Sequence, residues 1–553
     1  MIVDDGNSAG VASKPTLQDA SSNDMSRWNP PWKVWIFIAF TLLIIAIVRT
    51  TNITADHAVD NVITASLAFL AICTWVSWFS FYSRHALWVR MLPIAFFVLS
   101  VTAFFILNRI DHVSGDLIPV FARRSSFHPD QLLPLPARPT DSDDQNGPDF
   151  TSNTANDFPQ FLGPNRTAKI DGIDLSKDWE QAKPEQIWKQ PIGAGWSAFS
   201  AVNGYAVTME QRGPSELTTC YDLKTGKIQW SHATPARYQN KLGGIGPRST
   251  PTVDKGKIFS IGVTGQLKCL NGKDGTVIWE KNIPVEVGST AAEDRDAIYY
   301  GRSNSPLIVD DLLVVSGGGT AEKGFHSLLA YDKETGEEVW RGGTDQISYS
   351  SPSLTEICGV RQILIVNEQT VSGHDPHTGK LLWSHAWPGN NLSNSSSSQA
   401  VVIGPDKILL SKGYGTGAML LQISHSCDDQ WSADRVWDKH NVLRTKFANV
   451  VSKDAHAFGL SDGILQCVEI ATGRTKWKKG RYGHGQILLV GDKIIVLAEN
   501  GTVHLVAANP KKFEELGKFK AIEGISWNNL CLYGPYLLVR NSEQAACFKL
   551  PIQ

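Results

Sequence analysis

The sequence lacks the cysteine patterns that accompany haem attachment. Eight cysteines occur among 553 residues, no two of them are adjacent, and none form a Cys-x-x-Cys pair. A Cys-x-x-Cys-His motif is therefore absent as well, which excludes covalent c-type haem. Four cysteines share one position of a repeat described below: Cys220, Cys269, Cys467 and Cys547. We interpret these four as small buried hydrophobic residues and not as disulfides or metal ligands.

Strong charge and hydrolase signatures are missing too. The formal net charge is −2, whereas a nucleic-acid-binding protein would be strongly basic. There is no Gly-x-Ser-x-Gly elbow and no His-Glu-x-x-His motif. Histidines such as His374, His377, His425 and His440 are scattered, and we expect hydrogen-bonding or surface roles for them. The 18 tryptophans and 47 glycines favour an all-β fold with many turns.

Three uncharged apolar runs occupy residues 34–48, 62–82 and 91–107. A helix needs about 17–25 such residues to cross a bilayer. The second run ends in the aromatic residues Trp75, Trp78, Phe79, Phe81 and Tyr82, which is typical of a membrane interface. Buried core helices or a signal peptide are the alternatives. The sequence favours three transmembrane helices, because two runs follow the first and no convincing cleavage site separates them.

The basic residues near these runs predict their orientation. They are Lys14, Arg27 and Lys33 in the N-terminal flank, Arg84 and Arg90 in the second loop, and Arg49 in the first loop beside Asp56 and Asp60. Positive residues collect on the cytoplasmic side. We therefore expect a cytoplasmic N-terminus and an extracytoplasmic location for everything after Leu107, although Arg109, Arg123 and Arg124 run against this assignment.

Residues 109–157 are rich in Pro, Ser, Asp and Asn, as in the stretches 132–139 and 140–147. Such a composition buries too little apolar area to fold and predicts a flexible linker. We thus expect four segments. They are a polar cytoplasmic N-terminus (1–31), a membrane anchor with three transmembrane helices (32–108), the linker (109–157) and one large β-domain (158–553).

The β-domain is built from a ten-residue pattern. Its clear copies are residues 221–230, 270–279, 331–340, 374–383 and 468–477. Each predicts an outgoing strand, a tight turn and a return strand that ends in Trp. The turn glycines, Gly226, Gly275, Gly336, Gly379 and Gly473, permit a positive φ. The Asp or Asn before the turn can bond its backbone, and the Trp can pack against the next unit.

The spacing of the repeat tryptophans indicates a β-propeller. Trp230, Trp279, Trp340 and Trp383 are 49, 61 and 43 residues apart, which suits four strands per unit. The clear copy at Trp477 continues the series, and weaker copies lie at Trp188, Trp437 and near residue 516, giving eight blades. Seven is the alternative, because two units are degenerate. The orphan strand around Trp188 and the last strand, 545–550, predict closure of the ring by strand exchange.

The repeat resembles the pyrroloquinoline-quinone-type propeller repeat, with the consensus Ala-Leu-Asp-x-x-Thr-Gly-x-x-x-Trp, over about residues 158–553. That family includes quinoprotein alcohol dehydrogenases and the non-enzymatic assembly lipoprotein BamB. The stretches 158–166, 195–199, 210–213 and 243–252 look like planctomycete-type membrane-anchored members. The resemblance implies a bacterial protein, anchored in the inner (cytoplasmic) membrane, with an extracytoplasmic (periplasmic) propeller.

The dehydrogenases of this family have a vicinal disulfide, a calcium ion and an aspartate base in their quinone pocket. This sequence has no adjacent cysteines, and no acidic or amide cluster matches a calcium loop. We therefore expect no catalytic residue, no metal and no cofactor. The predicted function is a non-catalytic, membrane-anchored binding or scaffolding module. The alternative is a pyrroloquinoline-quinone-dependent alcohol dehydrogenase-like oxidoreductase.

Polar segments before the innermost strands form the candidate binding site. They bring basic and aromatic side chains toward one mouth of the central channel. The candidates are Trp196, Arg212, Arg237, Arg248, Arg302, Tyr349, Arg444, Lys446, Arg481 and His484. Converging cations predict a protein partner or a small anionic or polar ligand. The alternative is that these side chains fill the channel and bridge the blades.

Overall fold

The computed structural model describes residues 32–51, 57–136, 147–388 and 395–553. The predicted cytoplasmic N-terminus and residues 137–146 of the predicted linker lie outside the described residues, as does Asp56 of the first loop. The chain divides into two compact units. One comprises Met1–Arg109 and Phe121–Ser125, and the other comprises Ile110–Val120 and Ser126–Gln553.

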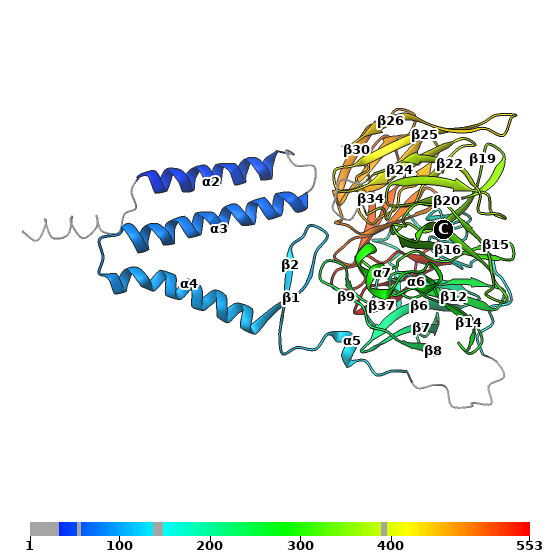
Figure 1. Cartoon of the computed structure of the whole chain (residues 1–553), viewed down its shortest axis with the longest axis horizontal. Coiled ribbons are helices and arrows are strands. Elements are labelled where there is room, and N and C mark those ends of the chain that lie inside the picture. The colour runs from blue at the N-terminus through cyan, green and yellow to red at the C-terminus, as the bar shows by residue number, and fades with distance from the viewer. Residues whose placement is uncertain (1–31, 52–56, 137–146, 389–394) are drawn as a thin grey trace, which may run out of the picture. The chain divides into compact units, whose positions relative to one another are not determined.

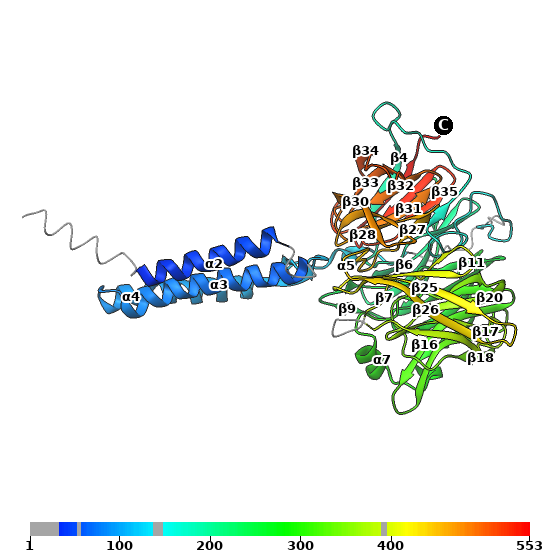
Figure 2. The ribbon, with the colours of Figure 1, turned by 90° about the horizontal axis from the view of Figure 1, so that it is seen from above.

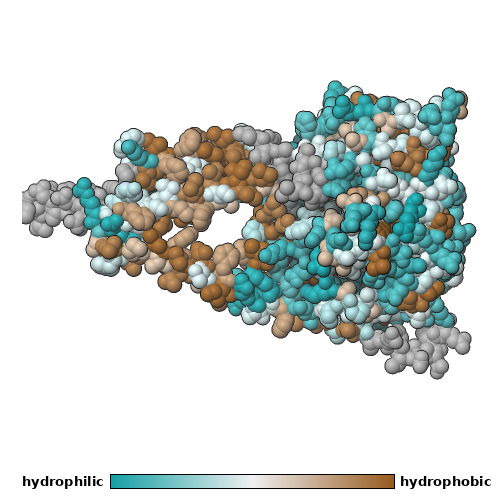
Figure 3. All heavy atoms as spheres, in the orientation of Figure 1, coloured by the Kyte–Doolittle hydropathy of each residue, from teal (hydrophilic) through white to brown (hydrophobic). Residues whose placement is uncertain are grey.

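The first unit contains three long helices, α2 (Trp32–Thr50), α3 (His57–Tyr82) and α4 (Leu87–Leu107). All three are long and apolar enough to cross a membrane, which confirms the prediction. Apolar side chains cover their visible surface (Figure 3), as lipid contact requires. At the α3–α4 turn, the Arg90 guanidinium donates to the carbonyls of Ser80 and Phe81 at 2.7 and 2.6 Å.

The second unit is a ring of eight β-sheets, the blades of a propeller (Figure 1). Six blades have four antiparallel strands in sequential order, a seventh has an additional parallel strand, and the eighth takes its fourth strand from the start of the domain. Blade 1 has β5 (Ser200–Val202), β6 (Tyr205–Arg212), β7 (Ser215–Asp222) and β8 (Ile228–Pro235). Blade 2 has β11 (Thr252–Asp254), β12 (Lys257–Ile261), β13 (Gln266–Asn271) and β14 (Val277–Asn282). Blade 3 has β15 (Leu307–Val309), β16 (Leu312–Thr320), β17 (Gly324–Asp332) and β18 (Glu338–Gly342). Blade 4 has β19 (Ser353–Ile357), β20 (Val360–Val366), β21 (Thr370–His374) and β22 (Leu381–Ala386).

The remaining blades follow the same plan. Blade 5 has β23 (Val401–Ile403), β24 (Lys407–Lys412), β25 (Gly417–His425) and β26 (Trp431–Lys439). Blade 6 has β27 (Val451–Lys453), β28 (His456–Ser461), β29 (Ile464–Glu469) and β30 (Arg474–Arg481). Blade 7 has β31 (Gln486–Val490), β32 (Lys493–Leu497), β33 (Thr502–Ala507) and β34 (Glu515–Lys520), with β3 (Lys169–Ile170) parallel to β31. Blade 8 has β35 (Cys531–Tyr533), β36 (Tyr536–Arg540), β37 (Gln544–Lys549) and β4 (Glu185–Pro191).

Blade 8 closes the ring. Its outermost strand, β4, comes from the start of the domain and lies beside the C-terminal strand β37 (Figure 2). In that pair Trp188 opposes Cys547. The predicted strand exchange is therefore confirmed, and the blade count is eight and not seven. Closure leaves the ring without a free sheet edge between its first and last blades.

The repeat tryptophans join each blade to the next. Trp188 donates its indole N–H to the Leu223 carbonyl at 2.8 Å, and Trp230 donates to the Gly272 carbonyl at 2.7 Å. The indole of Trp188 also covers Gly226, whose φ is +71°, and a Cβ there would lie 2.9 Å from the ring. Glycine is therefore required twice, for its conformation and for the close approach.

The shared cysteine position lies opposite the tryptophan. Cys220 pairs with Trp230, Cys269 with Trp279, Cys467 with Trp477 and Cys547 with Trp188. All four cysteines are fully buried and free. Their predicted role as small apolar residues is confirmed, because each is packed in the core of its blade and none forms a disulfide.

The segment predicted as a flexible linker differs from expectation within its described part. It contains β1 (Asn108–Val113) and β2 (Pro119–Arg123), which pair with each other, and the short helix α5 (Pro129–Leu132). Phe150 is buried in the core between blades 1 and 2. Composition could not show this, because the partners of these residues lie on the propeller. The predicted limits of the four segments stay predictions.

Two further short helices lie between blades 2 and 3, α6 (Ile283–Glu286) and α7 (Ala291–Ala297). The same face of the ring carries a small hairpin of β9 (Gln239–Asn240) and β10 (Gly244–Ile245). The two helices explain why Trp279 and Trp340 are spaced more widely than the other repeat tryptophans.

Candidate functional site

The face on which the innermost strands begin is hereafter the start face. The first strands of neighbouring blades contact one another, so they surround the central axis. Because the strands alternate in direction, the turns between second and third strands open on this same face. The polar segments before the innermost strands therefore meet around one mouth of the channel, as the sequence predicts.

These segments form a continuous ring of hydrogen bonds. In order around the ring, the bonds run from Ala198 N to Thr250 Oγ1 (3.2 Å), Thr250 N to Ser305 Oγ (2.9 Å), Ser305 N to Ser351 Oγ (2.8 Å), Ser350 Oγ to Gln399 Oε1 (2.8 Å), Gln399 N to Asn449 Oδ1 (2.9 Å), Gln486 Nε2 to the Phe447 and Trp527 carbonyls (2.9 and 2.8 Å), and Asn528 Nδ2 to the Gly195 carbonyl (3.0 Å). Hydroxyls and amides thus bridge the blades, which frees the cations for other partners.

Three predicted site residues lie in one neighbourhood. The carbonyl of Gly243 accepts from the indole N–H of Trp196 and from the Arg248 guanidinium, both at 2.6 Å. The guanidinium lies 5.2 Å from the centre of the Tyr238 ring. Burial lowers the pKa of Arg248 to about 10, so the side chain remains cationic at neutral pH. Tyr349 is half-buried, and its hydroxyl accepts from the Tyr300 N–H at 3.3 Å.

Half-buried aromatic rings continue from Trp196 around the mouth. Trp196 lies 4.7 Å from Trp527, Trp527 lies 4.9 Å from Phe447, and Phe447 lies 5.6 Å from His484, measured between ring centres. The sequence did not single out Trp527 or Phe447. Their place in the sequence could have identified them, since each lies shortly before an innermost strand. The arc offers apolar area at a polar rim, the arrangement that protein-binding hot spots favour.

Lys446 and His484 hold a turn of the chain from outside the ring. The Lys446 ammonium donates to the Gly115 carbonyl at 2.9 Å. The His484 Nε2 donates to the Asp116 carboxylate at 2.9 Å. Glu499, beside them, accepts from the Gly115 N–H at 2.9 Å. Both basic residues are almost fully buried.

Arg212 and Arg237 contact a second part of the same pre-propeller segment. Arg237 pairs with the buried carboxylate of Asp130 at 2.6 Å and also donates to the Gly213 carbonyl. Arg212 donates to the Pro134 carbonyl at 2.9 Å. Four of the ten predicted residues therefore hold peptide carbonyls or carboxylates of residues 115–134.

The last three predicted residues lie apart from these groups. Arg302 is fully buried and pairs with Asp294 of α7 at 2.7 Å. Arg444 pairs with the buried Asp462 at 2.6 Å. Arg481 ends β30 and is exposed. The first two follow the structural alternative, in which an arginine neutralises a carboxylate of the ring.

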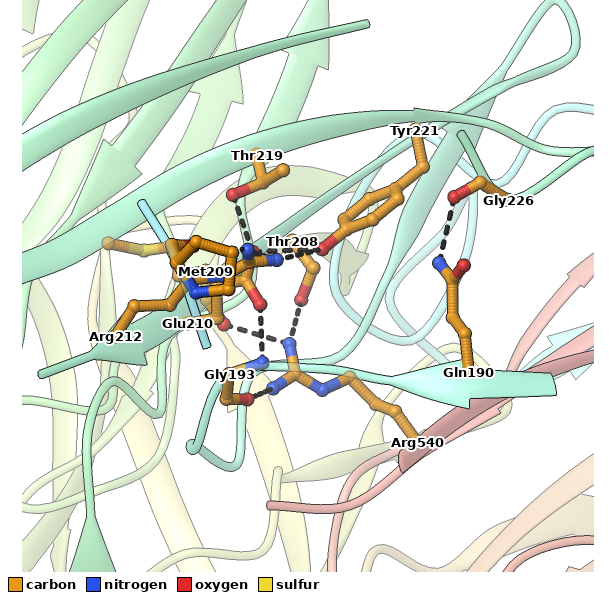
Figure 4. A network of polar contacts seen from close by, with 11 residues as sticks. Gln190, Gly193, Thr208, Met209, Glu210, Arg212, Thr219, Tyr221, Gly226 and Arg540 are labelled. Atoms are coloured by element: carbon orange, nitrogen blue, oxygen red, sulfur yellow. Dashed lines mark hydrogen bonds and ion pairs between the residues drawn. The ribbon is translucent and has the colours of Figure 1, made fainter. Parts of the chain in front are cut away.

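Figure 4 shows a buried ionic network that sequence reasoning missed. The Glu210 carboxylate accepts from the Gly193 N–H at 2.6 Å and from the Tyr221 hydroxyl at 2.8 Å, and it pairs with Arg212 at 3.1 Å. Burial alone would raise the pKa of Glu210, but the two guanidinium groups of Arg212 and Arg540 hold it below its ordinary value.

Arg540 joins blade 8 to blade 1 in this network. It lies on β36, is fully buried, and donates to the Thr208 hydroxyl at 2.6 Å and to the Met209 and Gly193 carbonyls at 2.8 Å each. Burial lowers its pKa to about 10. No repeat marks this position, because it belongs only to the joint where the ring closes.

A second buried acid, Glu216, begins β7. Its carboxylate accepts from the Val263 N–H at 3.1 Å. Burial raises the pKa of Glu216 to about 7, although this hydrogen bond and the charges of Arg248 and Lys268 oppose the rise. Acids with such a pKa serve in catalysis at some sites, but the bonding described here is structural.

The described residues do not fit the quinone and calcium site of the dehydrogenases. All eight cysteines are free. Within the described ranges, no group of three or more His, Cys, Asp or Glu side chains could hold a metal ion. The dehydrogenase disulfide and its acidic metal ligands are therefore not reproduced, and no step is assigned to a quinone. The expectation of no cofactor stays a prediction.

Comparison with known proteins places the propeller in a class. Residues 214–479, just under half of the chain, match the family model described as "Outer membrane protein assembly factor BamB". A stretch of 137 residues is 27% identical to quinohemoprotein alcohol dehydrogenase ADH-IIG of Pseudomonas putida. That stretch is 24% of this chain and 18% of that protein, so the chain covers less than a fifth of this relative's length.

Solved structures show the same fold. A europium-containing methanol dehydrogenase superposes with a TM-score of 0.54 at 12% identity, covering 72% of this chain and 98% of that one. Quinohemoprotein alcohol dehydrogenase from Comamonas testosteroni gives 0.51 at 14% identity, covering 72% and 81%. BamB from Moraxella catarrhalis gives 0.48 at 13% identity, covering 66% and 100%.

These findings define an eight-bladed β-propeller with three N-terminal helices fit to cross a membrane. Its repeats resemble the pyrroloquinoline-quinone-type repeat, and those within residues 214–479 match the BamB family model. Enzymes and non-enzymes share this fold, so the class alone does not fix the activity.

Proposed function

We propose that this protein is a non-catalytic binding or scaffolding module that three transmembrane helices anchor to a membrane. The observation that carries the proposal is the aromatic arc of Trp196, Trp527, Phe447 and His484 at the start face. The arc lies on a rigid ring, beside Arg248 and Lys446. Aromatic and arginine side chains around a concave, rigid mouth are what a protein partner or a polar ligand would anchor on.

We place the propeller outside the cytoplasm, with the helices in a bacterial inner membrane. The charges that flank the helices support this orientation. A reporter that is active only outside the cytoplasm, fused after Gln553, should be active. A reporter that needs the cytoplasm should be silent at the same position, and activity there would contradict the orientation.

Site-specific photo-crosslinking tests the binding function. A photoreactive amino acid at Phe447, in the arc, should give discrete protein adducts in native membranes. The same amino acid at Val339, exposed on the outermost strand of blade 3, is the matched control and should give none. Equal adduct patterns from both positions, or none from either, would contradict a binding site at the start face.

The quinone-dependent alternative has its own test. Purified protein mixed with pyrroloquinoline quinone and calcium should show no dye-linked oxidation of alcohols. The local likeness to an alcohol dehydrogenase motivates this assay. Saturable quinone binding with turnover would replace the scaffold by an oxidoreductase.

A further inference from the structure

We infer that the start face carries a binding site for an acidic peptide turn of the Gly-Asp type, and that the chain's own residues 114–117 occupy it. This inference deepens the proposed function and rests on it. The turn lies between β1 and β2. It is closed by a hydrogen bond from the Leu117 N–H to the Ser114 carbonyl at 2.9 Å, and Leu117 has a φ of +57°.

The site forms hydrogen bonds with both the backbone and a side chain of the turn. Glu499 accepts the N–H of Gly115, and Lys446 donates to its carbonyl, so both polar groups of one peptide residue are bound. His484 binds the carboxylate of the next residue, Asp116. An acceptor and two donors at these positions match a peptide turn that carries one negative charge.

The ligating groups are fixed by the propeller itself. The Glu499 carboxylate also accepts from the Trp527 indole N–H at 2.9 Å and from the His484 backbone N–H at 3.0 Å. The ring of Phe447 packs against the His484 imidazole. The pocket therefore keeps its shape when the turn leaves, and a preorganised site binds its ligand at a smaller entropic cost.

Glycine is required at position 115, the second residue of the turn. A Cβ on Gly115 would overlap the imidazole of His484. That ring is held by Phe447 on one side and by the Asp116 carboxylate at its Nε2, so it cannot move aside cheaply. A site that selects Gly followed by Asp is more specific than a basic surface would be.

The same kind of contact recurs where Asp130 and Pro134 of the pre-propeller segment meet the propeller. Arg237 binds the Asp130 carboxylate, and Arg212 binds the Pro134 carbonyl. At the turn 114–117 and again at Asp130 and Pro134, cations of the propeller thus bind an acid and a peptide carbonyl of the pre-propeller segment. An acidic extended peptide from a partner would satisfy the same groups.

The covalent link between the turn and the propeller determines how well an added peptide competes for the site. A segment joined by a short linker has an effective concentration of about a millimolar. A peptide in solution meets only the fraction of sites that the turn has left, and its apparent affinity falls by that fraction. Release of the turn should therefore raise the affinity for an added peptide.

The test uses the full chain in detergent and a fluorescein-labelled peptide of residues 110–120 as the probe. Gly115→Ala should expel the turn and tighten probe binding by about tenfold or more relative to wild type. Ile118→Ala, an exposed position beside the same turn, is the matched control and should leave probe binding at the wild-type value.

Two further variants establish the contacts. Gly115→Ala combined with Lys446→Ala should lose the gain, and a probe that carries Asn in place of Asp116 should bind the Gly115→Ala chain at least about tenfold more weakly. Amide exchange at residues 114–118 should be faster in Gly115→Ala than in wild type, which reports release of the turn directly.

The outcomes separate this inference from the proposed function. If amide exchange shows release but the probe binds no tighter, the peptide site is refuted, while adducts from Phe447 would still support a binding module. If residues 114–118 exchange equally fast in both chains, the turn is not seated in the site and the inference fails. Loss of the Phe447 adducts would instead refute the proposed function.

Discussion

Two groups of buried cations in the propeller find their partners in different ways. Arg540 and Arg302 are satisfied within the ring, by carbonyls, a hydroxyl and Asp294. Lys446, His484 and Arg237 are satisfied by Gly115, Asp116 and Asp130, which precede the first blade in the chain. The first group pairs within the ring, whereas we infer that the partners of the second group can be exchanged.

The difference separates cations that pair inside the ring from cations that pair with the preceding segment, which the sequence alone could not do. Both groups consist of basic residues near the start face. Removing a partner from inside the ring disturbs the cooperative unit, but removing a docked segment opens the structure only locally. The two groups should therefore respond differently to substitution.

The largest effect is expected at the closing joint. Arg540→Ala would leave the Glu210 carboxylate with less positive charge and the Gly193 and Met209 carbonyls without their donor. Losing one partner of a buried ionic network costs about 3–5 kcal/mol. Denaturant unfolding of the purified chain measures this loss. The exposed Arg481→Ala is the control, with an expected change below about 0.5 kcal/mol.

A loss below about 1 kcal/mol for Arg540→Ala would show that the joint is held by β4 pairing and not by the network. The contrast between the two groups of cations would then disappear.

The next effect concerns pH. The folded-state pKa of Glu216 is about 7, against an ordinary value of 4.5. The fold therefore favours the protonated acid, and its stability contribution is complete below about pH 4.5 and is lost as the pH rises through about 7. Glu216→Gln should raise the unfolding free energy at pH 8 by up to about 3 kcal/mol, with little change at pH 4.5.

Unfolding curves at the two pH values measure this difference. A stabilisation that is equal at both pH values would mean that the buried acid does not titrate. Glu216 sharpens the comparison, because its carboxylate accepts a hydrogen bond from the Val263 N–H inside the ring.

A smaller effect tests whether the ring unfolds as one unit. Trp230→Phe removes the donor to the Gly272 carbonyl between blades 1 and 2. The lost hydrogen bond and volume should cost about 1–3 kcal/mol. Unfolding followed by fluorescence and by circular dichroism should give coincident curves. Separate transitions would show that the blades melt independently. A single free energy of unfolding could then not be used to compare the two groups of cations.

The smallest effect is expected at the docked segment. Asp130→Asn removes the ion pair with Arg237, yet the ring keeps its own contacts. Global stability should change by less than about 0.5 kcal/mol, while residues 126–136 become more sensitive to protease. A global loss as large as that of Arg540→Ala would make the segment an integral part of the propeller.

Much of the fold was predictable because the repeat has a local physical cause. A turn that needs a positive φ selects Gly226 and its counterparts, and the tryptophan on the return strand marks the outermost strand of each blade. The blade around residue 516 was found without its tryptophan, from its place in the count. The docked part of residues 109–157 was missed, since its composition resembles a linker and its partners are distant.

The candidate site shows the same limit at finer scale. The sequence predicts that ten residues meet at one mouth, and the structure joins four of them to residues 115–134. The sequence did not show which carboxylate each cation pairs with, because nothing in the residues around Arg444 and Arg237 indicates a different partner for each. The partner of the first is Asp462 within the ring, and that of the second is Asp130 before it.

The sequence by itself determined the three apolar helices, the repeated blade and the closing strand, since each depends on a hydrophobic run or a turn within a few dozen residues. The tertiary structure alone decided which buried charges belong together. Asp116 and His484 are 368 positions apart, and Arg540 meets Thr208 across 332 positions. Such pairs leave no local pattern, because only the closed ring and the segment docked on it bring these residues together.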